Sequence, residues 1–246
     1  MSSPQGSPTA PAHQYALGED WLMQRYREIE ADLNGGADLD QVRLVFIGDS
    51  ITQFWQGWGG LTEVPPWDAA FGQRGSRNYG LNLGVAGDRT ENTLLRLLPV
   101  AEGGFGHMDD PRLQPEIIVL MLGVNNVSRT DEPVVEKIVA GDLAVIHRLR
   151  QLRPNASILV QSILPTEIAR DGPDIIEPVN RRLEAEVSAM GPNVTWLNLY
   201  PDFLGADGVL NPALFRDGYH LTLAGYQVWQ SRLLPALEAM RVSPLA

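Results

Sequence analysis

The sequence predicts a single α/β domain with a three-layer αβα architecture, in which a five-stranded parallel sheet lies between two layers of helices. Three observations predict it. Five apolar runs of strand length contain many β-branched residues, which is typical of strands buried on both faces of a parallel sheet. Stretches with helical hydrophobic spacing alternate with these runs. No internal repeat or long linker divides the 246 residues, so one domain is expected over residues 16–246.

The elements follow from the pattern in chain order. Residues 1–15 are polar, rich in Pro and Ser, and are expected to form a disordered tail. An amphipathic helix over Leu17–Leu33 comes next, and Gly35 and Gly36 end it. Strands are expected at Val42–Gly48, Tyr79–Gly84, Glu116–Gly123, Ala156–Leu164 and Asn193–Leu199. The later helices are expected at Arg89–Leu98, Pro133–Leu152, Pro173–Met190 and Leu221–Met240.

Composition argues against several classes of function. The 30 acidic residues outnumber 19 Lys and Arg, and the formal charge of −11 argues against a nucleic-acid partner, whose phosphates require clustered cations. The absence of cysteine excludes thiolate catalysis, disulfides and Cys-based zinc sites. No apolar run reaches the ~18 residues that span a bilayer, and the opening residues lack a signal-peptide pattern. We therefore expect a cytoplasmic protein, with secretion and assembly into a homo-oligomer left open.

Ser50 directly follows the first predicted strand, at a point where a helix can begin. Ligands bind beyond the carboxyl ends of parallel strands, so a serine here would present its hydroxyl at the functional edge of the sheet. The first N–H groups of a helix also favour negative charge nearby. The alternative is an ordinary helix N-cap serine. Ser50 is therefore a candidate nucleophile.

A serine nucleophile requires a base, and the chain contains four histidines. His13 lies in the predicted tail, His147 lies on a helix face that we expect to be solvated, and His107 lies in an acidic, glycine-rich loop interpreted as a solvated turn rather than a metal site. His220 differs, because Asp217 precedes it by three residues in a tight turn and can reach its Nδ1. The alternative for this segment is a surface Asp with a capping His.

Two further strand ends offer donors for an oxyanion. Gly87 lies in the loop after the second strand and can present its N–H without a side chain in the way. Asn125 lies after the third strand and offers a side-chain amide. Taken singly, a loop glycine or asparagine is usually conformational. Together, the four segments supply complementary parts of one esterase site.

These segments, in this order, resemble the four blocks of the SGNH or GDSL-like hydrolase family, named after its Ser, Gly, Asn and His. GDS with Ser50 resembles the first block, Gly87 in NLGVAGD the second, Asn125 in GVNN the third and His220 in DGYH the fourth. The resemblance implies Asp217 as the acid of a Ser-His-Asp triad. It implies the backbone N–H groups of Ser50 and Gly87, with the Asn125 side chain, as oxyanion donors. It also implies a flavodoxin-like strand order, 2-1-3-4-5, and no metal or organic cofactor is expected.

The resemblance extends from Val42 to Gln230 and departs from the common pattern at two places. The first block reads GDSI where many members have GDSL, and the third ends in Asn126 where Asp is usual. With NLGVAGDRTENTLLRL, these variants most resemble the branch that contains the catalytic subunits of intracellular platelet-activating-factor acetylhydrolase and related bacterial esterases. That likeness suggests a short acyl group such as acetyl.

The resemblance therefore implies a serine esterase that hydrolyses short-chain carboxylic esters through an acyl-enzyme. The expected substrate is a small-molecule or carbohydrate ester, as for a carbohydrate acetylesterase or an arylesterase. Candidate substrate-binding residues are Asp49, Trp55, Trp58, Asn126 and Tyr219, although buried tryptophans more often belong to a core. The alternatives are an acyltransferase with the same triad, a lysophospholipase- or thioesterase-type lipid hydrolase, and a catalytically inert binding module.

Overall fold

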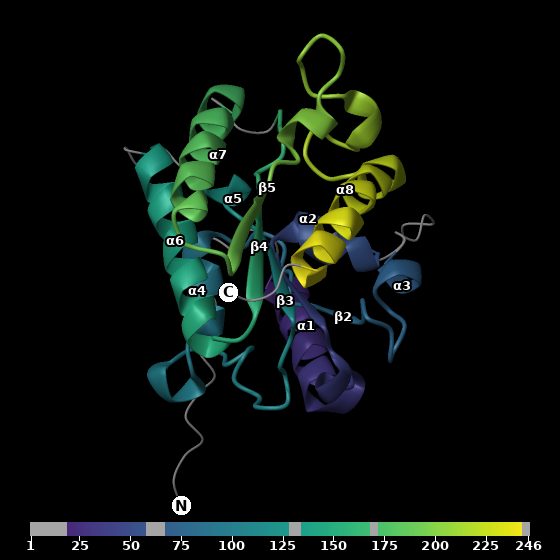
Figure 1. Cartoon of the computed structure of the whole chain (residues 1–246), viewed down its shortest axis with the longest axis vertical. Helices are drawn as coiled ribbons and strands as arrows, with labels where there is room; N and C mark the ends of the chain where they lie inside the picture. The colour runs from purple at the N-terminus through teal and green to yellow at the C-terminus, as the bar shows by residue number, and fades with distance from the viewer. Residues whose placement is uncertain (1–18, 58–66, 128–133, 168–171, 243–246) are drawn as a thin grey trace, which may run out of the picture.

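The computed structural model describes residues 19–57, 67–127, 134–167 and 172–242. Five parallel strands form one sheet in the order β2-β1-β3-β4-β5. Helices α4, α6 and α7 lie side by side on one side of this sheet and α8 lies on the other (Figure 1). The predicted three-layer α/β fold and the strand order 2-1-3-4-5 are confirmed.

The strands are β1 (Leu44–Gly48), β2 (Gly80–Asn82), β3 (Ile117–Met121), β4 (Ser157–Gln161) and β5 (Val194–Leu197). The helices are α1 (Glu19–Ala31), α2 (Ser50–Gln53), α3 (Trp67–Ala70), α4 (Thr90–Leu97), α5 (Val124–Val127), α6 (Val134–Leu152), α7 (Gly172–Ser188) and α8 (Leu223–Val242). Short helical turns lie at Asp32–Gly36, Leu39–Gln41, Phe54–Gln56, Val100–Glu102, Tyr200–Phe203 and Pro212–Leu214. None of the helices within the described ranges is both long and apolar enough to cross a lipid bilayer.

The apolar runs form central strands because both faces of the sheet are covered. Every residue of β1 and β3 is buried, which explains why these runs show no polar alternation. Side chains of β1 alternate between two hydrophobic clusters, with Leu44 and Phe46 in one and Val45 and Ile47 in the other. Trp229 of α8 packs in the first cluster and Tyr26 of α1 in the second.

Each predicted strand and helix is present, and the differences lie at the ends. The strands are up to three residues shorter at an end than the apolar runs, since a run continues into the loop beyond the last ladder hydrogen bond. The first helix ends at Ala31, two residues earlier than predicted, and a turn over Asp32–Gly36 carries the positive φ of 121° at Gly35. The predicted tail, residues 1–15, lies outside the described residues.

Glycine at two positions allows the chain to turn sharply at the carboxyl edge of the sheet. A Cβ at Gly48, the last residue of β1, would lie 2.2 Å from Oγ1 of Thr52 and 2.5 Å from the carbonyl oxygen of Met121. A Cβ at Gly84, just beyond β2, would lie 2.6 Å from the backbone nitrogen of Gln53. Side chains at these positions would therefore push α2 away from the strand ends, and the residue that begins α2 is Ser50.

Candidate active site

Ser50 is the first residue of α2 and is almost fully buried, with 2% of its surface exposed. The preceding Asp49 caps this helix, because its Oδ1 accepts a hydrogen bond of 2.9 Å from the backbone N–H of Ile51. The cap belongs to Asp49 rather than to Ser50. The alternative interpretation of Ser50 as an N-cap serine is therefore wrong, and its hydroxyl is directed elsewhere.

The Ser50 hydroxyl contacts His220, which lies 170 residues later in the chain. Nε2 of His220 lies 3.0 Å from Oγ of Ser50, and Nδ1 of His220 lies 2.8 Å from Oδ2 of Asp217. Oδ1 of Asp217 also accepts hydrogen bonds from the backbone N–H groups of His220 at 2.7 Å and Tyr219 at 3.1 Å. The structure thus brings the three residues predicted as a triad into one hydrogen-bonded row.

The electrostatics of this row favour one tautomer of His220. Burial acts to raise the pKa of Asp217, but the hydrogen bonds from the side chain and backbone of His220 outweigh it and lower the pKa. A carboxylate can only accept a hydrogen bond, so the ring proton of a neutral His220 lies on Nδ1. Nε2 is then an acceptor for the Ser50 hydroxyl proton.

Contacts between neighbouring elements hold the segment that carries Ser50 and the segment that carries His220 together. The hydroxyl of Tyr226, on α8, donates a hydrogen bond of 2.8 Å to the carbonyl of Ile51 in α2. The ring of Phe54 lies against the imidazole of His220, with centroids 5.2 Å apart. These contacts fix α8, and the turn that precedes it, against the helix that carries Ser50.

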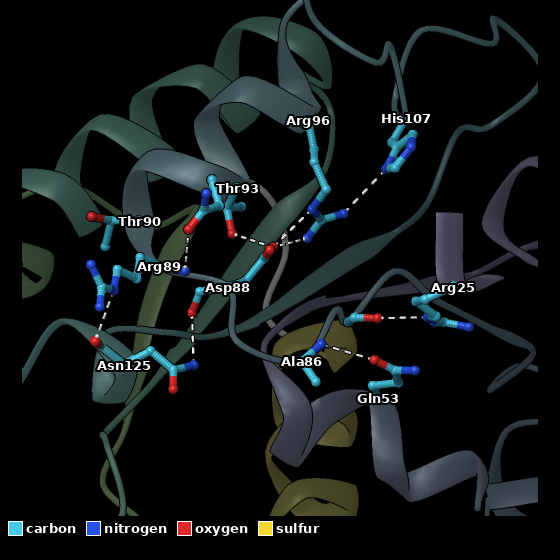
Figure 2. Close-up of polar contacts among 12 residues, drawn as sticks. Arg25, Gln53, Ala86, Asp88, Arg89, Thr90, Thr93, Arg96, His107 and Asn125 are labelled. Atoms are coloured by element: carbon cyan, nitrogen blue, oxygen red, sulfur yellow. Dashed lines mark hydrogen bonds and ion pairs between the residues drawn. The ribbon is translucent and has the colours of Figure 1, made fainter. Parts of the chain in front are cut away.

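The predicted oxyanion glycine lies in a loop that other residues hold in place. Gly87 has a φ of 75°, a left-handed conformation that favours glycine. Next to it, the N–H of Ala86 donates to Oε1 of Gln53 at 2.8 Å, and Nδ2 of Asn125 donates to the carbonyl of Asp88 at 2.9 Å (Figure 2). The loop is therefore tied both to α2 and to α5.

Behind this loop is a buried polar network that the sequence analysis missed. Oδ2 of Asp88 accepts hydrogen bonds from Nε and Nη2 of Arg96, at 2.8 and 2.6 Å, and from Oγ1 of Thr93 at 3.0 Å. Nη1 of Arg96 lies 3.2 Å from Nδ1 of His107 (Figure 2). Asp88 and Arg96 are eight residues apart, before and near the end of α4, and this spacing was the sequence signal that could have predicted their ion pair. The network fixes the backbone on the far side of Gly87.

His107 corrects an expectation, because it is 1% exposed and not part of a solvated turn. Its ring packs against Tyr26 and Phe105. The acidic, glycine-rich sequence around His107 gave no indication that these rings would bury it. Burial, followed by the charges of Arg96 and Arg25, lowers the pKa of His107 well below its usual value. Arginine can only donate, so Nδ1 of His107 accepts and its ring proton lies on Nε2. The expectation that His147 is exposed is confirmed.

Two carboxyl groups are fully buried near the nucleophile. Oδ2 of Asp49 and Oδ2 of Asp142, on α6, have no hydrogen-bond partner among the described residues. Burial, assisted by the charge of Asp88, raises the pKa of Asp49 to about 7. Burial and the charge of Asp49 likewise raise the pKa of Asp142 well above its usual value. Asp49 therefore caps α2 with one carboxyl oxygen and carries a buried, ionisable second oxygen.

A cavity of about 210 Å³ opens above Ser50. It is lined by Trp21, Ser50, Phe54, Ala86, Gly87, Asn125, Tyr219 and His220. Trp21, from α1, and Phe54 were not identified from the sequence, and they pack edge to face at 6.4 Å. The cavity thus joins Ser50 and His220 of the candidate triad, the candidate oxyanion residues Gly87 and Asn125, and an aromatic wall.

The remaining candidates for substrate binding occupy different places. Tyr219 lines the cavity, whereas Asn126 faces α4, where its Oδ1 accepts from the N–H of Thr90 at 3.2 Å and its Nδ2 donates to Glu91 at 3.0 Å. Trp55 is 0% exposed and packs on Trp229 with ring centroids 4.2 Å apart. It belongs to the core, which was the alternative given for the tryptophans, and is not in the cavity. Trp58 lies outside the described residues.

Comparison with known proteins identifies the family. The model of the GDSL-like Lipase/Acylhydrolase family matches residues 46–228, about three quarters of the chain. The chain belongs to this family. As a member of the GDSL-like hydrolases it is an enzyme that hydrolyses carboxylic esters. The resemblance noted from four short motifs is thereby confirmed.

Relatives of this GDSL-like hydrolase include two proteins from Rattus norvegicus. The alpha1 subunit of platelet-activating factor acetylhydrolase IB is 29% identical over 186 residues, which are 74% of this chain and 69% of that protein. The alpha2 subunit is 26% identical over 231 residues, which are 92% of this chain and 88% of that protein.

Solved structures share the fold of this hydrolase. A GDSL-like lipase from Bacteroides thetaiotaomicron aligns with a TM-score of 0.65 at 22% identity, over 87% of this chain and 98% of its own. A chain from Streptococcus pneumonia aligns with a TM-score of 0.67 at 24% identity, over 92% of this chain and 99% of its own.

Proposed function

We propose that this GDSL-like hydrolase is a serine esterase for short-chain carboxylic esters, with Ser50 as nucleophile, His220 as general base and Asp217 as the acid of the triad. The observation that carries the proposal is the hydrogen-bonded row in which His220 lies 3.0 Å from Ser50 on one side and 2.8 Å from Asp217 on the other. A nucleophile in reach of a base that a third group orients is the arrangement that acyl transfer requires.

The proposed reaction has two steps. In the first, Oγ of Ser50 attacks the ester carbonyl while Nε2 of His220 takes its proton; the tetrahedral intermediate then collapses, and His220 protonates the departing alcohol. In the second, His220 takes a proton from water, which attacks the acyl-enzyme; the second tetrahedral intermediate then collapses, His220 returns the proton to Oγ of Ser50, and the carboxylic acid is released. Asp217 stabilises the imidazolium that forms in each step.

The negative charge on the substrate oxygen is assigned to donors from three strand ends. They are the backbone N–H groups of Ser50 and Gly87 and the Nδ2 group of Asn125, residues that all line the cavity. The N–H of Ser50 belongs to the first turn of α2, whose backbone N–H groups favour an anion. Removing one such donor from a comparable serine hydrolase costs about 100- to 1000-fold in kcat.

The size and lining of the cavity favour a small acyl group. About 210 Å³ is below the ~300–1000 Å³ of pockets that enclose drug-sized ligands. The aromatic wall of Trp21, Phe54 and Tyr219 fits an aromatic or sugar ring in the alcohol part of the ester. The name of the rat relatives, an acetylhydrolase, agrees with an acetyl-type acyl group. An arylesterase or carbohydrate acetylesterase is therefore favoured over a hydrolase for long-chain lipid esters.

The test is hydrolysis of p-nitrophenyl esters from acetyl to long acyl chains by the wild type and by Ser50→Ala. We expect turnover to favour acetyl or butyryl esters and to vanish in Ser50→Ala, while a fluorophosphonate probe labels only the wild type. Equal activity in the two proteins would reject Ser50 as nucleophile, and a preference for long chains would reject the short-acyl proposal. Product analysis with and without added alcohol distinguishes hydrolysis from acyl transfer.

A further inference from the structure

Tyr219 lies between the acid and the base of the proposed triad and extends across the cavity to the oxyanion side. Its backbone N–H donates to Oδ1 of Asp217 at 3.1 Å, and its ring packs edge-on against His220 with centroids 4.5 Å apart. Its hydroxyl donates a short hydrogen bond to Oδ1 of Asn125. One residue thus contacts the acid, the base and the asparagine that completes the oxyanion site.

The partners of Asn125 determine which way its amide faces. The carbonyl of Asp88 can only accept, so the group 2.9 Å from it must be the amide nitrogen, Nδ2. The amide oxygen then faces the hydroxyl of Tyr219, which must act as the donor. Nε of Arg89 holds the backbone of the same residue by donating to the Asn125 carbonyl at 3.0 Å.

An amide oxygen that accepts from a phenol also makes its own N–H groups better donors, because hydrogen bonds in a chain polarise one another. The Asp88 carbonyl holds the nitrogen of the amide and the Tyr219 hydroxyl holds its oxygen, so loss of the hydroxyl removes the hydrogen bond on the oxygen side. Rotation of the Asn125 side chain would then point Nδ2 away from the position of the substrate oxygen.

We infer that Tyr219 is a positioning residue, whose hydroxyl holds the Asn125 amide so that Nδ2 faces the substrate oxygen. The inference rests on the proposed function, since it assigns to Asn125 the role of oxyanion donor. It goes beyond that function, because it adds a residue to the proposed triad and oxyanion donors and links the triad turn to the oxyanion site.

The chemistry of the phenol suits a permanent donor. Burial raises the pKa of Tyr219 well above its usual value, and the carboxylates of Asp49 and Asp217 add to this, although a hydrogen bond with Ser50 opposes it. The hydroxyl therefore keeps its proton over the pH range in which an esterase works. The hydrogen bond to Asn125 persists under the same conditions.

The experiment is a double-mutant cycle with Tyr219→Phe, Asn125→Ala and the combined variant, measured with p-nitrophenyl acetate. We expect Tyr219→Phe to lower kcat about tenfold with KM changed less than about twofold, and Asn125→Ala to lower it about 100- to 1000-fold. In the Asn125→Ala background, the loss of the hydroxyl should change kcat less than about twofold. Tyr79→Phe, which removes a hydroxyl that contacts the backbone of Asp38 at 3.3 Å, is the matched control and should match the wild type.

Additive losses in the cycle would overturn the inference, because they would mean that Tyr219 acts independently of Asn125, on the substrate, on the fold or through its hydrogen bond with Ser50. A second readout does not depend on activity. The side-chain N–H signals of Asn125 in a ¹⁵N spectrum, assigned by their absence in Asn125→Ala, should shift in Tyr219→Phe and not in Tyr79→Phe. If they did not shift, the contact would be refuted even in an inert protein. Failure of the triad itself would appear separately, as equal turnover by wild type and Ser50→Ala.

Discussion

Replacing Asp49 with Asn tests whether a carboxyl group buried beside the nucleophile makes the stability of this protein fall with rising pH. Asp49 is 1% exposed, its Oδ1 caps α2, and its Oδ2 has no partner among the described residues. An asparagine keeps the cap, since its amide oxygen can accept the same hydrogen bond from Ile51. The substitution therefore removes the ionisable group and retains the local structure.

The magnitude follows from the pKa of Asp49, which burial raises from 3.8 to about 7. The folded state then keeps a proton that the unfolded state releases at lower pH. This group contributes stability that is fully present below pH 3.8 and is lost as the pH rises to about 7. The difference of about three pKa units corresponds to at most about 4 kcal/mol.

The assay is urea unfolding of wild type and Asp49→Asn at several pH values from 4 to 9. We expect the variant to gain stability over the wild type as the pH rises, up to about 4 kcal/mol, and the gain to level off above the pKa of Asp49, about 7. Asp40→Asn, which removes one carboxylate at an exposed position, is the matched control for the change in charge. A constant difference between wild type and Asp49→Asn over the whole range would refute the reasoning.

Three further substitutions test other parts of the site. In Asp217→Asn, an amide cannot stabilise the imidazolium, so kcat should fall about 100- to 10,000-fold with little change in KM; an unchanged kcat would remove Asp217 from the triad. Arg96→Met removes the cation that pairs with the buried carboxylate of Asp88, and should lower the free energy of unfolding by about 3–5 kcal/mol, with partial recovery in Arg96→Met/Asp88→Asn. Because the pKa of His107 is lowered in the folded state, the protein loses stability as the pH falls below the usual 6.5. Between pH 7 and pH 5, the free energy of unfolding measured in urea should therefore fall less in His107→Asn than in the wild type. Parallel losses would contradict that expectation.

The central strands could be predicted because their residues are buried on both faces and carry an uninterrupted apolar signal. The apolar run VRLVFIG predicts β1. Asp49 and Ser50 follow it directly and are therefore predicted at the carboxyl edge of the sheet. His220 and Asp217 could be paired because they are neighbours in one turn, where sequence separation and distance agree. The strand order, in contrast, came from the resemblance and not from periodicity.

The parts that could not be predicted depend on which distant surface covers a residue. His107 reads as part of a polar loop, yet Tyr26 of α1 and Phe105 bury it and Arg96 pairs with it. Trp55 follows the nucleophile closely in sequence, but the helix turns its ring onto Trp229 in the core. Trp21 lines the cavity although it precedes Ser50 by a whole helix and strand. Local patterns contain no information about these contacts.

The placement of Ser50 and His220 also has a consequence for how the enzyme acquires its activity. Asp217 and His220 are three residues apart, whereas Ser50 and His220 are separated by 170 residues. Contacts between distant residues close a long loop and limit the rate of folding more than local turns do. In the native structure the imidazole reaches the hydroxyl with α8 docked on α2, where the Tyr226 hydroxyl donates to the carbonyl of Ile51. Ester turnover during refolding should therefore report the completion of the whole domain, and should appear after most of the secondary structure has formed.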